Sequence, residues 1–186
     1  MARADDIHTL PEDLPVPEDD KAADHLVKAV VPPIALTATT GETIRLGTQE
    51  GRTVLFCYPR TGRPGEELPP GWNAIPGARG CTPEACGFRD AHSQFADLGV
   101  RVLALSTQSP DYQHEMAGRL HLPFPVLSDE RLELTHALGL PTFETSGMTL
   151  LKRLTLVIDD GRISHVFYPV FPPDSHAAEV LEWLRT

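Results

Sequence analysis

The sequence lacks any continuous apolar run near the roughly 18 residues that a membrane-spanning helix needs. Its N-terminal segment also lacks the apolar stretch of a secretory signal, so we expect neither a membrane span nor export. Cations are scarce, because 16 Lys and Arg stand against 26 Asp and Glu, for a net charge of −10. Nucleic-acid binding needs clustered cations, so this balance argues against such a partner. We therefore expect a cytoplasmic protein without membrane or nucleic-acid partners.

Cysteine is also rare, with only Cys57, Cys81 and Cys86. Three is an odd number, so the cysteines cannot all pair within a disulfide scaffold. In a chain without an export signal, a cysteine pair is more often catalytic or metal-binding than structural. Cys57 lies within an apolar run and is expected to be a buried core thiol. A zinc site of Cys81, Cys86 and His92 fits no common zinc-knuckle spacing, and a fourth ligand is not evident.

The chain has 186 residues, of which 41% are hydrophobic, and this suits one folded domain with a small addition. Residues 1–29 are acidic and rich in proline, so we expect an N-terminal arm that is either docked or disordered. If the arm docks, Leu10, Leu14 and Val16 are the side chains expected to hold it on the domain or on a second subunit. Residues 30–186 are expected to form the domain.

Within that domain, residues 60–79 form an insertion dense in Gly and Pro, which excludes an α-helix or an interior strand. A loop of this length in a compact domain is usually functional or disordered. Two interpretations remain open: a lid over a pocket, or a surface loop held down by Trp72 and Ile75.

Apolar periodicity predicts strands alternating with helices. Residues 53–58 and 100–106 are apolar runs typical of strands buried on both faces. The other expected elements are an N-terminal β-hairpin around Thr40–Gly41, helices at 82–98, 111–120 and 129–138, strands at 150–159 and 162–168 joined at Asp160–Gly161, and a last helix capped by Asp174 or Ser175. This order predicts an α/β, thioredoxin-like fold in which helices flank a central mixed β-sheet.

Cys81 stands at the expected start of a helix, where Thr82 would be the N-cap, Pro83 the first helical residue and Glu84 an acid in the first turn. A helix N-terminus favours the thiolate. Lowering a thiol pKa from about 8.5 to near 6 takes roughly 3–4 kcal/mol, and a helix end contributes at most about 2 kcal/mol. A low pKa for Cys81 therefore requires an arginine beside it.

Cys86 follows Cys81 by five positions. In a continuous helix that spacing separates the side chains by roughly 140° around the axis and about 7.5 Å along it. The two thiols can form a disulfide only after the first turn and a half of the helix unwinds. This behaviour favours a redox cycle over a structural disulfide, although Cys86 as a small buried hydrophobic residue remains the alternative.

Residues 80–90, GCTPEACGFRD, resemble the GCT-x-x-AC-x-x-RD stretch of the bacterioferritin-comigratory and peroxiredoxin Q group of peroxiredoxins, in the AhpC/TSA superfamily. The resemblance extends over about residues 30–186. It includes the Tyr58-Pro59 strand end, the segments 105–106 and 124–129, and the segment 152–159, which is similar to the strand carrying the family's active-site arginine.

This resemblance implies a thiol peroxidase that reduces hydrogen peroxide and organic hydroperoxides. Cys81 would be the peroxidatic cysteine, Cys86 the resolving cysteine that forms a disulfide with it, and Arg153 the cation beside the thiolate. Pro59 would shield the site from water. A thioredoxin- or glutaredoxin-type reductant would regenerate the enzyme, and no metal or organic cofactor is required. A monomer is favoured over a homodimer, because a resolving cysteine in the same helix needs no second chain.

The sequence departs from the family between Pro59 and Cys81, where the family has a short loop and this chain has the long insertion. The family usually has a threonine three residues before the peroxidatic cysteine, where this chain has Ala78. Thr61 is the expected replacement for its hydroxyl, and Thr82 is a weaker candidate. The alternatives to a peroxidase are a thiol–disulfide oxidoreductase, which usually has a closer C-x-x-C pair, and a non-enzymatic redox-sensing domain on the same fold.

Overall fold

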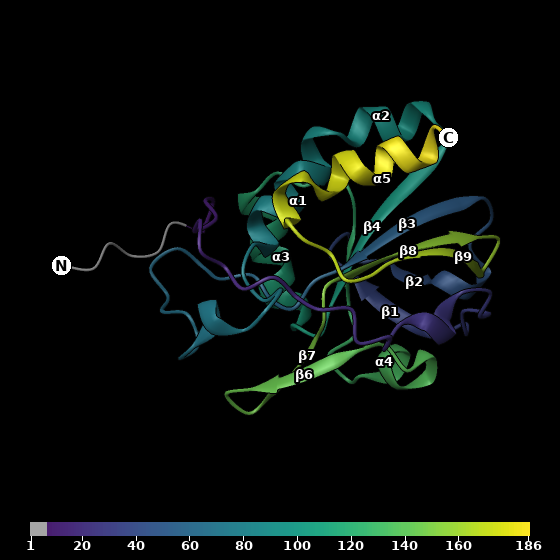
Figure 1. Ribbon diagram of the computed structural model, residues 1–186. Coiled ribbons are helices and arrows are strands. Elements are labelled where there is room, and N and C mark those ends of the chain that lie inside the picture. The colour runs from purple at the N-terminus through teal and green to yellow at the C-terminus, as the bar shows by residue number, and fades with distance from the viewer. Residues whose placement is uncertain (1–6) are drawn as a thin grey trace.

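The computed structural model describes residues 7–186, which contain a seven-stranded mixed sheet (Figure 1). Its strands, in spatial order, are β2 (Thr43–Arg45), β1 (Ala35–Ala38), β5 (Val126–Ser128), β4 (Val100–Ser106), β3 (Arg52–Cys57), β8 (Leu154–Asp159) and β9 (Arg162–Phe167). β3 pairs parallel to β4 and antiparallel to β8. The thioredoxin-like fold with a mixed central sheet is therefore confirmed.

The two faces of β3 belong to two separate apolar clusters. Val54 and Phe56 pack toward the cluster that holds α1 (Cys81–Asp90), α2 (His92–Asp97), α3 (Pro110–Arg119) and α5 (His176–Leu184). Leu55 and Cys57 face the cluster that includes α4 (Glu133–Leu138). This alternation explains the continuous apolar run, since a strand covered on both faces needs apolar residues at every position. Figure 1 shows α1, α2 and α5 on one side of the sheet and α4 on the other.

The cysteine-bearing helix differs from the expectation in two ways. It begins at Cys81 with Gly80 as its N-cap, and Thr82 lies inside the first turn instead of capping it. The single helix expected over residues 82–98 is two helices, because the chain breaks at Ala91 between α1 and α2. The stacking of Phe56 on Phe88, with ring centroids 4.3 Å apart, fixes α1 against β3. The short first helix therefore has its own anchor in the core.

The strand expected over residues 150–159 is also interrupted. Its first residues belong to β7 (Met148–Leu151), which pairs with β6 (Thr142–Thr145) in a separate two-stranded sheet. A two-residue link, Lys152–Arg153, then leads into β8. The 124–129 segment contains the strand β5, which lies between β1 and β4. The tight hairpin at Asp160–Gly161 is confirmed, with both residues at positive φ.

The N-terminal segment and the insertion pack on the domain. The short 3-10 helix η1 (Asp24–Leu26) lies in the N-terminal segment. Leu26 within it and Ala23 just before it are buried in the apolar cluster that includes α4. In the insertion, the 3-10 helix η3 (Trp72–Ala74) places Trp72 in a small cluster with Ala78 and Leu150. Figure 1 shows the N-terminal segment beginning at the end of the domain where the insertion lies and running along the domain to η1 near β1 and β2. Within residues 7–186, every helix is too short or too polar to cross a lipid bilayer.

Candidate active site

Gly80 sets the start of α1 and the position of Cys81. Its φ of +106° lies in a region that L side chains rarely adopt. A Cβ at this position would also collide with Pro173 of the 3-10 helix η4 (Pro173–Ser175). The Gly80 carbonyl accepts the first helical hydrogen bond, from the Glu84 amide at 3.0 Å. Cys81 is thus held at the first position of the helix, where its side chain is 4% exposed.

Arg153 reaches the sulfur from the link between β7 and β8. Its Nη2 donates to Cys81 Sγ at 3.2 Å and also to the carbonyl oxygens of Ala78 and Arg79, each at 3.2 Å. Its Nη1 forms a buried ion pair with Glu84. The guanidinium therefore lies between a thiol and a carboxylate of the same helical turn. The arginine that a low Cys81 pKa requires is present, but it is shared.

This sharing bears on the ionisation of Cys81. Burial raises the pKa of the Cys81 thiol; Arg153 lowers it by charge and hydrogen bonding, and the charge of Glu84 raises it. With α1 fully wound, the pKa of the Cys81 thiol lies above its ordinary value. The expectation of a lowered Cys81 pKa is therefore wrong for this state. Burial likewise raises the pKa of Glu84 to about 7 despite Arg153. If Glu84 were protonated, the Cys81 thiolate would be the one remaining anion paired with Arg153 in this cluster, and Arg153 would stabilise it more strongly.

The end of β3 supplies the opposite side of the site. Pro59 is buried two residues after the end of this strand, and a backbone hydrogen bond from Arg60 favours the Cys81 thiolate. Thr61 is 1% exposed. Its amide and hydroxyl both donate to the side-chain oxygen of Gln108, at 3.0 and 3.3 Å, and Gln108 Nε2 donates back to the Thr61 carbonyl at 3.2 Å. Gln108 therefore fixes Thr61 in the pocket wall.

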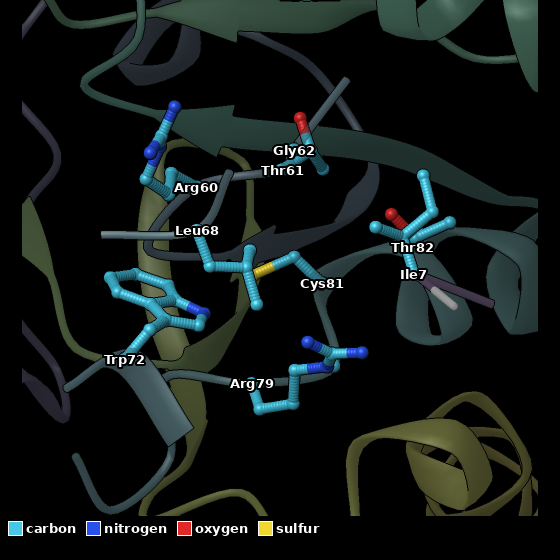
Figure 2. Close-up of a pocket in the computed structure, with 10 residues that line it drawn as sticks. Ile7, Arg60, Thr61, Gly62, Leu68, Trp72, Arg79, Cys81 and Thr82 are labelled. Carbon is cyan, nitrogen blue, oxygen red and sulfur yellow. The ribbon is translucent and has the colours of Figure 1, made fainter. Parts of the chain in front are cut away.

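A small pocket opens over the sulfur (Figure 2). Four segments line it: the end of β3, the insertion, the start of α1 and the N-terminal arm. The lining residues are Arg60, Thr61, Gly62, Leu68, Trp72, Arg79, Gly80, Cys81, Thr82 and Ile7. In Figure 2, Arg60 and Trp72 lie on one side of Cys81, and Ile7 and Thr82 on the other. The insertion is thus held down by Trp72 and also supplies part of the pocket wall.

The other two cysteines have different surroundings. Cys86 lies in the same unbroken helix as Cys81, is half-buried, and is a free thiol. The structure therefore has the two thiols apart, as the helical spacing predicts. Cys57 is fully buried in β3, and burial raises its pKa far above the ordinary value. The interpretation of Cys57 as a core thiol is confirmed.

Two residues of the site escaped the sequence reasoning. Glu84 was interpreted only as a favourable charge in the first helical turn, although it also faces Arg153. A carboxylate three residues after Cys81 lies on the same helical face, and that spacing is the signal for it. Gln108 follows β4, and its role could not be predicted from neighbouring residues. Its contact with Thr61 joins positions that are 47 residues apart in the sequence.

Comparison with known proteins places this geometry in a family. The model of the Redoxin family matches residues 22–181. Peroxiredoxin Bcp of Escherichia coli strain K12 is 31% identical over 161 residues, covering 84% of this chain and 93% of that protein. Chloroplastic peroxiredoxin Q of Sedum lineare is 31% identical over 156 residues, covering 83% and 75%.

A solved structure agrees with these relatives. The crystal structure of peroxidoxin BcpB from Mycobacterium tuberculosis matches with a TM-score of 0.67 and 30% identity, covering 86% of this chain and 96% of that one. The fold, the thiol at a helix start and the relatives all point the same way. The chain belongs to the redoxin family, as a peroxiredoxin of the Bcp and peroxiredoxin Q type, and is a thiol peroxidase.

Proposed function

We propose that Cys81 is the peroxidatic cysteine of this enzyme. Its thiolate attacks the terminal oxygen of a hydroperoxide, the S–O bond forms, and the O–O bond breaks. The sulfur is oxidised to a sulfenic acid, and the leaving oxygen takes up a proton as water or an alcohol. The observation that carries this proposal is the hydrogen bond from Arg153 to the sulfur at the first turn of α1.

Arg153, Pro59 and Thr61 have distinct roles in this step. Arg153 holds the thiolate and polarises the O–O bond, since its charge faces a sulfur in a residue that is only 4% exposed. Pro59 excludes water from one side. Thr61 supplies a hydroxyl to the bound hydroperoxide in place of the family's usual threonine, which is supported by its place in the pocket beside Cys81.

Cys86 is proposed as the resolving cysteine. After the first turn of α1 unwinds, its thiol condenses with the sulfenic acid, giving a Cys81–Cys86 disulfide and one water. A thioredoxin- or glutaredoxin-type dithiol then reduces this disulfide by exchange. Because both cysteines lie on one helix, the cycle needs one chain, and we infer a monomer. The three free cysteines suit the reducing cytoplasm.

Mass spectrometry after one equivalent of hydrogen peroxide tests the proposal. Wild type is expected to lose two hydrogens, mapped to a Cys81–Cys86 link. Cys86→Ser should react once and stop with Cys81 as sulfenic acid or a higher oxide, and Cys81→Ser should not react. Cys57→Ser is the matched control and should behave as wild type. Peroxide consumption by Cys81→Ser at the wild-type rate would overturn the assignment.

A further inference from the structure

The N-terminal arm reaches the first turn of α1. Ile7 lines the same pocket as Cys81, and its Cγ2 lies 3.7 Å from the Cβ position of Gly62. Leu10 Cδ2 is 2.9 Å from the Cβ position of Gly80. Only a glycine leaves room for this contact, so the half-buried Leu10 side chain packs directly on the residue that begins the helix.

A second anchor fixes the arm on the other side of the site. The Asp20 carboxylate accepts from Lys152 Nζ at 2.6 Å and from the Tyr168 hydroxyl at 2.7 Å. Lys152 directly precedes Arg153, the residue that holds the sulfur. Between the two anchors, Pro17 lies 3.6 Å from the Cβ position of Gly77. The arm therefore spans the site from the helix start to the Arg153 link.

We propose that residues 7–20 act as a clamp on the Gly80–Cys81 turn, with Leu10 as the positioning residue and Asp20 as the tether. The clamp keeps Cys81 in the pocket during peroxide attack and slows the unwinding that brings it to Cys86. This inference rests on the proposed function, because it concerns the step between the sulfenic acid and the disulfide.

The clamp acts on one of two competing fates of the sulfenic acid. In resolution, Cys81–SOH and the Cys86 thiol give a disulfide and water. In overoxidation, Cys81–SOH reduces a second hydroperoxide and becomes a sulfinic acid, releasing water or an alcohol. Resolution needs the unwound turn, whereas overoxidation occurs in the closed pocket. Leu10 contacts the wound turn, so it favours the wound state and shifts the balance toward overoxidation.

Stopped-flow fluorescence and hydrogen exchange test the clamp in the full chain. Because Trp72 lines the pocket, its fluorescence is expected to change on oxidation of Cys81 and again, as a first-order phase, on resolution. In Leu10→Ala a half-buried leucine is lost, so resolution should be faster by about five- to tenfold. The fraction of Cys81 oxidised to sulfinic acid at the same peroxide concentration should be correspondingly smaller. Asp20→Asn should act in the same direction, and Leu10→Met should restore wild-type values.

The control is Val16→Ala. Val16 was also expected to hold the arm, but it is 63% exposed, so that expectation is wrong and its truncation should change neither the resolution rate nor the amide exchange. Hydrogen exchange of the reduced protein needs no peroxide, so it separates this inference from the proposed function. Amide exchange over residues 84–86 should accelerate in Leu10→Ala and Asp20→Asn and stay unchanged in Val16→Ala. Exchange and resolution rates within twofold of wild type in both arm variants would overturn the clamp.

Discussion

The guanidinium of Arg153 donates a hydrogen bond to the sulfur of Cys81 while its other terminal nitrogen is paired with Glu84. One fully buried cation therefore serves two groups that both ionise to anions. Its attraction is divided between them, so the protonation of either group changes the other. The reactivity of the sulfur is set by all three residues together.

Replacing Arg153 by Gln is expected to raise the pH at which the Cys81 thiolate forms by at least about one unit and to slow peroxide attack about tenfold or more, since the stabilising charge is lost. The measurement is the pH dependence of the oxidation phase. Arg79→Gln, which alters another arginine of the same pocket, is the control. A shift in the Arg79 variant with none in the Arg153 variant would transfer the role to Arg79.

Replacing Glu84 by Gln should lower the pH at which the Cys81 thiolate forms, which is the opposite of the effect expected for Arg153→Gln. The charge of Glu84 raises the pKa of Cys81, so an uncharged amide lowers it and leaves Arg153 to the thiolate. We expect the midpoint of thiolate formation to fall by about one unit. Alkylation of the Cys86→Ser background across pH measures it at Cys81. An unchanged or higher midpoint would contradict the shared-cation model.

Thr61→Ala is expected to slow sulfenic acid formation about tenfold, the size of one hydrogen bond to the bound hydroperoxide. Thr61→Ser keeps the hydroxyl and should retain most of the rate. The second-order rate constant of the oxidation phase measures both. If Thr61→Ala equals wild type and Thr82→Val is slow, the hydroxyl belongs to Thr82, which lines the same pocket.

His176 should make the fold sensitive to acid. Its ring lies between the Thr155 hydroxyl and the Glu179 carboxylate, each at 2.8 Å, and burial lowers its pKa. Below pH about 6.5 the unfolded chain gains a proton that the native ring resists, so the free energy of unfolding falls as pH falls. The raised pKa of Glu84 acts in the opposite direction over the same range, so the His176 contribution is measured as the difference between wild type and a His176 variant in urea unfolding from pH 7.5 to 5.

The matched variants for that measurement are His176→Gln and His114→Gln. The first removes the titrating ring from the core, so its free energy of unfolding should fall less, or rise more, than that of wild type as the pH falls. The second removes an exposed histidine and should leave it unchanged. Equal slopes in wild type and His176→Gln would assign the acid sensitivity to other groups.

Local pattern was enough to predict the elements that carry the site. The apolar run of β3, the turn at Asp160–Gly161 and a helix start beside Cys81 all follow from neighbouring residues. The required arginine was predicted on electrostatic grounds, and Arg153 meets it geometrically.

What the sequence could not reveal depends on contacts between distant segments. The pairing of Glu84 with Arg153 spans 69 residues. Burial of the thiol reverses the expected direction of the Cys81 pKa, and the charge of Glu84 adds to that effect. The place of Leu10 beside Gly80 depends on how the arm docks. The break at Ala91 and the β6–β7 pair are likewise set by packing over local preference.

The location of both redox thiols on the ten-residue α1 has a kinetic consequence. In the proposed cycle, capture of the oxidised sulfur is an event within one molecule, so its half-life is independent of enzyme concentration. Dilution slows only the encounters with hydroperoxide and with the reductant. At very low abundance each molecule would still complete its own oxidation, and the supply of external dithiol alone would determine how soon it reacts again.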